Sequence, residues 1–354
     1  MRVLIDICHP AQIHFFKHLI ARLQNRGDEV LVTARDKDVV KPLLSLCNAQ
    51  YELLTTASSG LFGLGREFLI RNWRLSRIVG RFRPDIMMAE SGAIIGLVGA
   101  LRRVPRIVLE FSEHAKLQRA LGLPFATRIL TGTGYQSVHG RRHRKFKGIW
   151  VSAYLCPERF QANASILGSA GVDPGSRYTL IRTVSWNAAH DVGHGDASQE
   201  GLRRVVNHLQ KYGRVFLVPE GDLPNWAEEC RLPVDAKDVH HLLAFASLYL
   251  GEGGTMAAEA AVLGVPTIYT GIRTGFLDAL QSRYRLIEYA ESLDGALPKA
   301  DDLLSNPRWR EEWADRRNTL LDESEDIVAF LENSIDEVMD GNSTRSKVSV
   351  FSAM

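Results

Sequence analysis

The residue pattern with the most specific chemistry lies at positions 251–266, which read GEGGTMAAEAAVLGVP. A short apolar strand is expected to end at this point, and Gly253 and Gly254 then form a turn that permits positive φ angles and a close approach to the backbone. Thr255 is expected to open an alanine-rich helix that ends at Gly264. The unpaired N–H groups and the dipole at such a helix start favour an anion. The pattern therefore predicts a binding site for a phosphate or diphosphate.

One carboxylate, Glu259, lies a turn further along the same expected helix. If Thr255 is the N-cap, a capping box would need its acid at Ala258, so Glu259 comes one residue too late for that role. The vicinal hydroxyls of a ribose are suitable donors to a carboxylate beside a diphosphate. Glu259 is therefore predicted either to bind a ribose or to face solvent, since glutamate is a good helix former.

Two histidines follow the first expected strand, residues 2–7, within the stretch ICHPAQIHFF. Because ligands bind at the carboxyl ends of parallel strands, His9 and His14 are candidates for binding a substrate and for general-base catalysis, respectively. A histidine near its ordinary pKa can take the proton of an acceptor hydroxyl. The alternative for His14 is that it begins a helix and bonds only to the backbone.

Carboxylates end two further expected strands, at 85–90 and 106–111. Glu90 closes one strand, and Glu110, Glu113 and His114 lie at the end of the other. Several acids at one sheet edge could perform acid–base catalysis, although ion pairs with nearby arginines are an equally good interpretation.

The most polar loop, SWNAAHDVGHGD, follows the expected strand at 178–184. It is predicted to bind phosphate or sugar through the four residues Ser185, Asn187, His190 and Asp191. His190 and His194 are four residues apart, but Gly193 and Gly195 disfavour a rigid helical pair, so no metal site is expected. Arg273 is expected to approach the diphosphate. The charge of Glu252 would repel an anion, so Glu252 is expected either to point away or to pair with Arg182 or Arg273.

These residues are positioned by a repeated alternation of short apolar runs and helical patterns. Apolar runs separated by helices indicate parallel, doubly wound sheets of the α/β class. We expect an N-terminal Rossmann-like domain over 1–155, a Gly- and Pro-containing linker over 156–177, a second such domain over 178–338 and a disordered tail over 339–354. The carboxyl ends of the two sheets are expected to face one central cleft.

Composition is that of an ordinary globular protein, with 354 residues, 45% of them hydrophobic. Four scattered cysteines indicate neither a disulfide framework nor a zinc site. The most apolar run, residues 93–101, is about half of the roughly 20 residues that a membrane-spanning helix needs. We expect a cytoplasmic protein, because polar side chains interrupt the first fifteen residues where a signal peptide would be apolar.

Charge is distributed unevenly between the two halves. Residues 1–150 hold 24 Lys and Arg against 11 Asp and Glu, and the remainder holds 19 against 30. Arginines alternate with apolar side chains over 66–83, and a second basic stretch covers 140–147. This surface is expected either to rest peripherally on the inner face of a membrane or to be an ordinary solvated face. A nucleic-acid partner is not expected, because no nucleic-acid-binding module is recognisable.

The stretch GEGGTMAAEAAVLGVPTI resembles the nucleotide-sugar motif of GT-B-fold glycosyltransferases and of the nonhydrolysing UDP-N-acetylglucosamine 2-epimerases. Over about residues 1–275 the chain resembles an uncharacterised GT-B-like family catalogued as domain of unknown function 354. The matching stretches are DICHPAQIHFFKHLI, EVLVTARD, RPDIMMAESG, SEHAKLQRALGLPFA, SWNAAHDVG and GEGGTMAAEAAVLGVPTIY. The resemblance implies two Rossmann-like domains, a diphosphate on Gly253, Gly254 and Thr255, and a ribose on Glu259.

Two departures from the resembling families concern Glu252. The epimerases have a small residue where this chain has that acid. The Glu-x7-Glu pattern of retaining GT-B transferases is also missed by one residue, because six residues separate Glu252 from Glu259. This spacing favours inverting chemistry or none.

The expected function is therefore transfer of a UDP-linked sugar by inversion, without metal or cofactor, to a glycan or lipid-linked acceptor in polysaccharide biosynthesis. His14 or Glu113 would be the base. The alternatives are a 2-epimerase-like isomerase, in which Glu90, Glu110 and Glu113 act on the sugar ring, and a noncatalytic nucleotide-sugar-binding protein.

Overall fold

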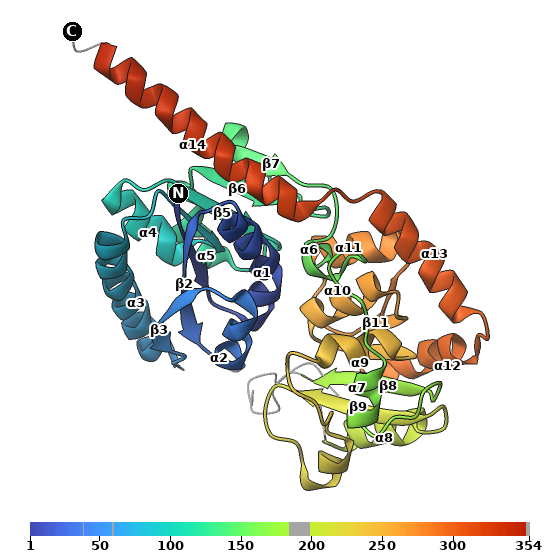
Figure 1. Ribbon diagram of the computed structural model, residues 1–354. Helices are drawn as coiled ribbons and strands as arrows, with labels where there is room; N and C mark the ends of the chain where they lie inside the picture. Colours follow the sequence, from blue (N-terminus) through green and yellow to red (C-terminus); the bar gives the residue numbers. More distant parts are fainter. Residues whose placement is uncertain (38, 59, 184–198, 352–354) are drawn as a thin grey trace. The chain divides into compact units, whose positions relative to one another are not determined.

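Two sheets of parallel strands organise the chain, and each belongs to its own unit (Figure 1). The computed structural model describes residues 1–37, 39–58, 60–183 and 199–351. The contacts divide the chain into a first unit, Met1–Tyr154 with Glu325–Met354, and a second unit, Leu155–Ser324. The expected α/β class with two doubly wound parallel-sheet domains is confirmed.

The sheet of the first unit has the strand order β3-β2-β1-β4-β5-β6-β7 over the described residues. The order reverses direction at β1, so β1 and β4 are neighbours at a topological switch point, where open α/β sheets place their ligands. The strands are β1 (Arg2–Ile7), β2 (Glu29–Asp36), β3 (Gln50–Thr56), β4 (Ile86–Glu90), β5 (Arg106–Glu110), β6 (Arg128–Thr131) and β7 (His143–Lys145).

Helices cover both faces of this sheet, which is why its strands are apolar on both sides. The helices of the first unit are α1 (Pro10–Asn25), α2 (Val40–Leu43), α3 (Gly60–Phe82), α4 (Ala93–Arg102), α5 (Lys116–Gly122) and α14 (Ile327–Phe351). Leu75 of α3 and Ile95 of α4 pack with Leu4 and Met87 of the sheet in one fully buried core. A short helix, α6 (Ser152–Leu155), lies at the boundary of the two units.

The C-terminal helix belongs to the first unit, which differs from the expected boundaries. α14 packs against α1, and the ring of Phe330 meets that of Phe146 edge to face, 5.8 Å between centroids. Arg26 of α1 bonds Asp336 at 2.9 Å. The expected linker, 156–177, lies in the second unit, and α14 continues to Phe351, where a disordered tail was expected from residue 339.

The second unit has the strand order β12-β11-β10-β8-β9, again parallel over the residues described. Its strands are β8 (Tyr178–Thr183), β9 (Arg214–Pro219), β10 (Leu248–Gly251), β11 (Thr267–Tyr269) and β12 (Ile287–Tyr289). Its helices are α7 (Ser165–Ser169), α8 (Gln199–Leu209), α9 (Val239–Phe245), α10 (Gly254–Leu263), α11 (Gly275–Ser282), α12 (Leu297–Ser305) and α13 (Trp309–Asp322).

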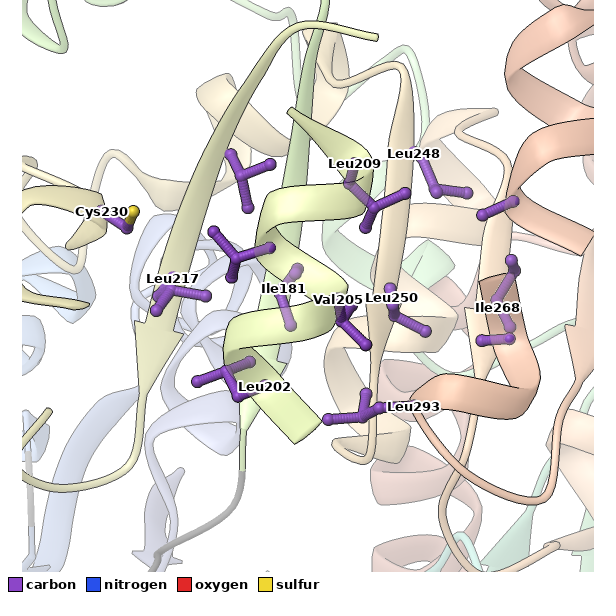
Figure 2. Packing of buried hydrophobic residues seen from close by; sticks show 14 of the residues in the cluster. Ile181, Leu202, Val205, Leu209, Leu217, Cys230, Leu248, Leu250, Ile268 and Leu293 are labelled. Atoms are coloured by element: carbon purple, nitrogen blue, oxygen red, sulfur yellow. The ribbon is translucent and has the colours of Figure 1, made fainter. Parts of the chain in front are cut away.

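The core of the second unit forms where α8 lies over the sheet, as Figure 2 shows. Leu202, Val205 and Leu209 recur at helical spacing on α8 and pack towards Ile181 and Leu250 of the strands. This packing holds β8 and β10 side by side, with Gly251 opposite Arg182 at their carboxyl ends. The loop that begins α10 therefore starts from a rigid sheet edge.

No helix among the residues that the structure describes is long and apolar enough to cross a membrane. The long helix α3 is amphipathic, and several of its apolar side chains are exposed.

Candidate functional site

The glycine turn predicted from the sequence lies at the carboxyl end of β10, directly before α10. Gly253 is the N-cap, with φ −80° and ψ 101°, two residues before the expected cap, so Thr255 lies inside the first turn of the helix. The expectation that Thr255 is the N-cap is therefore wrong. A glycine N-cap has no side chain to satisfy the first N–H groups, which suits an anion.

Arg182, at the end of β8, lies against this turn. A Cβ atom at Gly253 would be 3.3 Å from its Cδ and Nε, and one at Gly251 would be 2.5 Å from its carbonyl oxygen. The guanidinium of Arg182 also pairs with Glu220 at 2.8 Å. The helix start thus has a cation beside it, although sequence reasoning treated Arg182 only as a partner for Glu252.

Glu259 is buried, with 4% of its surface exposed. The alternative of a solvent-facing side chain is therefore wrong. Its Oε1 lies 3.0 Å from Nε2 of His240, which is also buried, on α9. Alanines flank Glu259 in the sequence of α10, and Ala257, Ala258, Ala260 and Ala261 are fully buried.

Arg273 lies in the loop between β11 and α11, in the same unit. It pairs with Asp278 at 2.9 Å, and its guanidinium carbon lies 4.5 Å from the centre of the Tyr289 ring. Burial raises the pKa of the Tyr289 phenol, and the nearby Asp278 acts in the same direction. Arg273 therefore has an ion-pair partner close to β12, and its role towards a diphosphate remains a prediction.

The predicted loop residues Ser185, Asn187, His190 and Asp191 lie outside the described residues.

In the first unit, β1, β4 and β5 bring several predicted residues to one sheet edge. His9 is the N-cap of α1, and its Nδ1 accepts the N–H of Ala11 at 3.3 Å. Gln12 completes the capping box by accepting the His9 N–H at 3.3 Å. The side-chain amide of Gln12 also donates to Glu90. His9 thus has a structural role as a helix cap.

The carboxyl group of Glu90 ends β4 and is linked to the first turn of α1 through Gln12. Burial raises the pKa of Glu90, while the hydrogen bond from Gln12 acts in the opposite direction. Gln12 was not identified from the sequence, because its amide reaches a residue 78 positions away along the chain.

Glu110, at the end of β5, is buried at the same sheet edge, with 1% of its surface exposed. Burial raises its pKa to about 8, and the charge of Glu90 adds to the shift. Arg119 opposes it only weakly, because its Nε lies 3.9 Å from Oε2. Oε1 has no hydrogen-bond partner among the described residues. Such a carboxyl group can hold a proton near neutral pH and release it, which is the property of a general acid or base.

The remaining predicted residues are less well placed for chemistry. Glu113 accepts the backbone N–H groups of Gln136 and Ser137, at 2.8 and 3.3 Å, so it orders the chain after β6. His114 is exposed. His14 is 5% exposed and stacks on Tyr154, 5.6 Å between ring centroids. The structure thus brings Glu90 and Glu110 together and leaves His14 inside the packing of the first unit.

Within the described part of the chain, no group of three or more His, Cys, Asp or Glu residues could hold a metal ion. The carboxyl edge also contains a buried ion pair that the sequence did not reveal, in which Arg71 of α3 bonds Asp6 of β1 at 3.0 Å. Thr33 donates to the other oxygen of Asp6 at 2.7 Å. This pair fixes the start of the loop that leads to His9.

A family model described as a protein of unknown function (DUF354) matches residues 1–275 of the chain. The protein belongs to the DUF354 family. An uncharacterized protein of Methanocaldococcus jannaschii is 23% identical to this DUF354 member over 275 residues, which are 75% of this chain and 80% of the relative. The resemblance inferred from the sequence is confirmed.

Solved structures at 12–14% identity share the fold of this DUF354 protein. UDP-GlcNAc 2-epimerase from Neisseria meningitidis, bound to UDP-GlcNAc, has a TM-score of 0.69 and 14% identity, covering 91% of this chain and 99% of that one. The S. aureus MnaA–UDP structure has a TM-score of 0.70 and 12% identity, covering 96% and 97%. Glycosyltransferase SsfS6 from Streptomyces sp. SF2575, with thymidine diphosphate, has a TM-score of 0.62 and 14% identity, covering 94% and 99%.

Proposed function

We propose that this protein is an enzyme that acts on a nucleotide-sugar, with the nucleoside diphosphate bound at the start of α10. The observation that carries the proposal is the glycine N-cap at Gly253, with Arg182 alongside. The first N–H groups of α10 have no side-chain cap among the described residues, and these groups, the helix dipole and a guanidinium all favour a diphosphate. The UDP and thymidine diphosphate in structures of the same fold support this ligand class.

Glu259 is the proposed ribose-binding group. Burial raises the pKa of Tyr249, and the charge of Glu259 adds to this shift. The Tyr249 hydroxyl donates to the Gly253 carbonyl at 3.3 Å. Glu259 therefore lies close enough to Tyr249 for their charges to interact, and Tyr249 is bonded to the glycine turn. A carboxylate in this position can accept the ribose hydroxyls of a nucleotide whose diphosphate lies at the turn.

The proposed reaction is inverting transfer of the sugar to an acceptor hydroxyl. Ionised Glu110 would take the acceptor proton while the acceptor oxygen bonds to the anomeric carbon and the bond from that carbon to the diphosphate breaks. Its pKa of about 8 makes it an effective base near neutral pH. Glu110 replaces His14 as the proposed base, because the His14 ring is stacked inside the packing. We retain the expectation that neither metal nor cofactor takes part.

A second candidate function is 2-epimerisation of the sugar of a nucleotide-sugar, without transfer to an acceptor. The observation that favours it is the pair of acids at neighbouring strand ends, half-buried Glu90 and buried Glu110, whose pKa values are both raised. Coupled carboxyl groups lose their protons in separate steps, so one can donate while the other accepts. Removal and return of a ring proton requires both activities.

One experiment tests both reactions and is followed by NMR. The protein is incubated with UDP-N-acetylglucosamine in D2O, with and without lipid-linked or soluble glycan acceptors. Acceptor-dependent release of UDP supports transfer, and deuterium at C2 of the sugar supports epimerisation. We expect Glu110→Gln to lose at least about a hundredfold in rate, and Glu113→Gln is the matched control. Absence of nucleotide binding would contradict the whole proposal.

The acceptor is proposed to be membrane-bound, because α3 carries an exposed apolar and basic face. Phe62, Leu69 and Trp73 are 97%, 70% and 58% exposed, and their spacing of seven and four residues places them on one side of the helix. The guanidinium of Arg77 lies 5.0 Å from the centre of the Trp73 ring. Aromatic side chains with interleaved arginines suit the interface of an anionic membrane.

Vesicle sedimentation tests this surface. We expect wild-type protein to bind vesicles that contain phosphatidylserine and to bind pure phosphatidylcholine weakly. The double variant Leu69→Ala/Trp73→Ala should lose this binding. Leu117→Ala, which removes a 73%-exposed leucine from α5, is the control. Equal sedimentation of the double variant and the wild type would rule out α3 as the contact.

A further inference from the structure

The contact between α9 and α10 assigns a role to a residue outside the predicted nucleotide site. We propose that His240 is a positioning residue, which holds the Glu259 carboxylate in the orientation that accepts a ribose. The inference rests on the proposed function and deepens it, since it names the group that makes the site select ribonucleotides over deoxyribonucleotides.

The direction of the bond follows from the chemistry of the two groups. His240 Nε2 lies 3.0 Å from Glu259 Oε1. An ionised carboxylate can only accept hydrogen bonds, so the proton must be on Nε2 of the ring. A carboxylate has about four lone-pair positions, and one ring N–H uses only part of that capacity.

Burial explains why Glu259 needs a fixed partner. Glu259 is the one ionisable residue of α10, and only 4% of its surface is exposed. A carboxylate in such surroundings is costly unless hydrogen bonds satisfy it. The imidazole supplies one such bond and limits the rotation of the carboxylate about its own axis.

His240 is itself held in place by the chain that enters the second unit. The ring of Phe160 meets that of His240 edge to face, 6.2 Å between centroids and at 82°. α9 packs directly against α10, and α7 packs against α9. The position of the imidazole is therefore set by its own helix, α9, and by the segment around Phe160 and α7, more than seventy residues earlier in the chain.

The neighbouring histidine, His241, provides a matched control, because it contacts the same phenylalanine but bonds to the backbone of Asn163. His241 stacks on Phe160, 4.9 Å between centroids, and its Nδ1 accepts the N–H of Asn163 at 3.1 Å. His241 thus secures the 160–163 segment to α9, whereas His240 contacts the proposed ribose-binding group.

A glutamine at position 240 is the conservative replacement, since its side-chain NH2 can reach about where Nε2 lies. A leucine there removes the donor and keeps a comparable apolar volume. These two substitutions separate loss of the hydrogen bond from loss of packing, and thermal unfolding of each variant confirms that it is folded.

The test measures dissociation constants for UDP and 2′-deoxy-UDP by calorimetry. We expect the wild-type protein to bind UDP about tenfold more tightly, the value of one charge-assisted hydrogen bond. His240→Leu should reduce this ratio towards one, His240→Gln should restore most of it, and His241→Leu should leave it unchanged. In the Glu259→Gln background, His240→Leu should cause no further change in the ratio.

The ratio of the two dissociation constants distinguishes a positioning role from a general structural role. Loss of a general structural role would weaken the binding of UDP and of 2′-deoxy-UDP equally. An unchanged ratio in His240→Leu overturns the positioning role and leaves the proposed function standing. A wild-type protein that binds UDP and 2′-deoxy-UDP equally overturns the ribose assignment and with it the role of His240. Failure of the wild-type protein to bind either nucleotide overturns the proposed function itself.

Discussion

The carboxylate of Glu67 on α3 accepts two hydrogen bonds from the guanidinium of Arg35 on β2, at 2.6 and 2.7 Å. Thr55 and the backbone N–H of Ser58 donate to the same carboxylate at 3.0 and 2.9 Å. Glu67 therefore joins α3 to two strands and to the loop that precedes the helix. The buried side of α3 is anchored by polar contacts, while its opposite side carries the exposed apolar residues.

The first prediction concerns acid stability. Burial by itself would raise the pKa of Glu67, but the hydrogen bonds from Arg35, Ser58 and Thr55 outweigh it and lower the pKa from 4.5 to about 2. The stabilisation is therefore present above pH 4.5 and is lost as the pH falls towards 2. We expect Glu67→Gln to flatten the fall in unfolding free energy between pH 5 and 2, measured by urea denaturation. An identical pH dependence in both proteins would contradict this.

The second prediction concerns Glu110, whose pKa of about 8 departs from its ordinary value in the opposite direction. Between that ordinary value and pH 8, the folded protein holds a proton that the unfolded chain releases, so stability falls as the pH rises. A tenfold difference in proton affinity between the folded and unfolded chain corresponds to about 1.4 kcal/mol. We expect Glu110→Gln to unfold at higher urea than wild type at pH 8.5 and to lack this decline. The reverse order at pH 8.5 would show that the carboxylate is stabilised when ionised.

The third prediction separates folding from ligand binding at the glycine turn. A Cβ at Gly251 would lie 2.5 Å from the Arg182 carbonyl oxygen, a backbone atom that cannot give way easily. At Gly253 the nearest atoms are 3.3 Å away and belong to a flexible side chain. Gly251→Ala should therefore destabilise the second unit by about 1–3 kcal/mol. Gly253→Ala should fold with near-native stability and weaken UDP binding, as calorimetry would show.

The fourth prediction concerns the buried pair of Asp6 and Arg71. Removing one partner leaves a buried charge uncompensated, so Arg71→Leu should cost about 3–5 kcal/mol of unfolding free energy. Replacing both, in Arg71→Leu/Asp6→Leu, should recover a substantial part of that loss. Chemical denaturation of the single and double variants measures the coupling, and additive losses would mean that the two charges do not stabilise each other.

The two parallel sheets could be predicted because their strands are short apolar runs, and that local pattern does not depend on distant contacts. The helix expected to start near His14 starts at Pro10, with His9 as its N-cap, so that expectation was wrong. Proline favours the first helical position, and this local signal was overlooked. The glycine turn was recognised, but Thr255 was expected to be the N-cap, whereas the N-cap is Gly253; threonine and glycine are about equally good caps, so residue type alone does not choose between them.

The partners of the site residues could not be predicted in the same way. Gln12 reaches Glu90, and His240 reaches Glu259, only because the fold brings separate elements together. A glutamine or a histidine near a helix start carries no local signal of such a contact. The raised pKa of Glu110 likewise depends on its burial and on Glu90, which lies on a neighbouring strand.

The position of α14 has a consequence for the order in which the chain is completed during synthesis. Its apolar residues Ile327, Leu331 and Ile335 are buried in the first unit, while all of the second unit precedes them in the chain. A ribosome therefore releases every residue of the second unit before the last helix of the first is available. Until α14 is synthesised, the surface that it covers in the first unit stays exposed, whereas the second unit already has all of its residues and can fold.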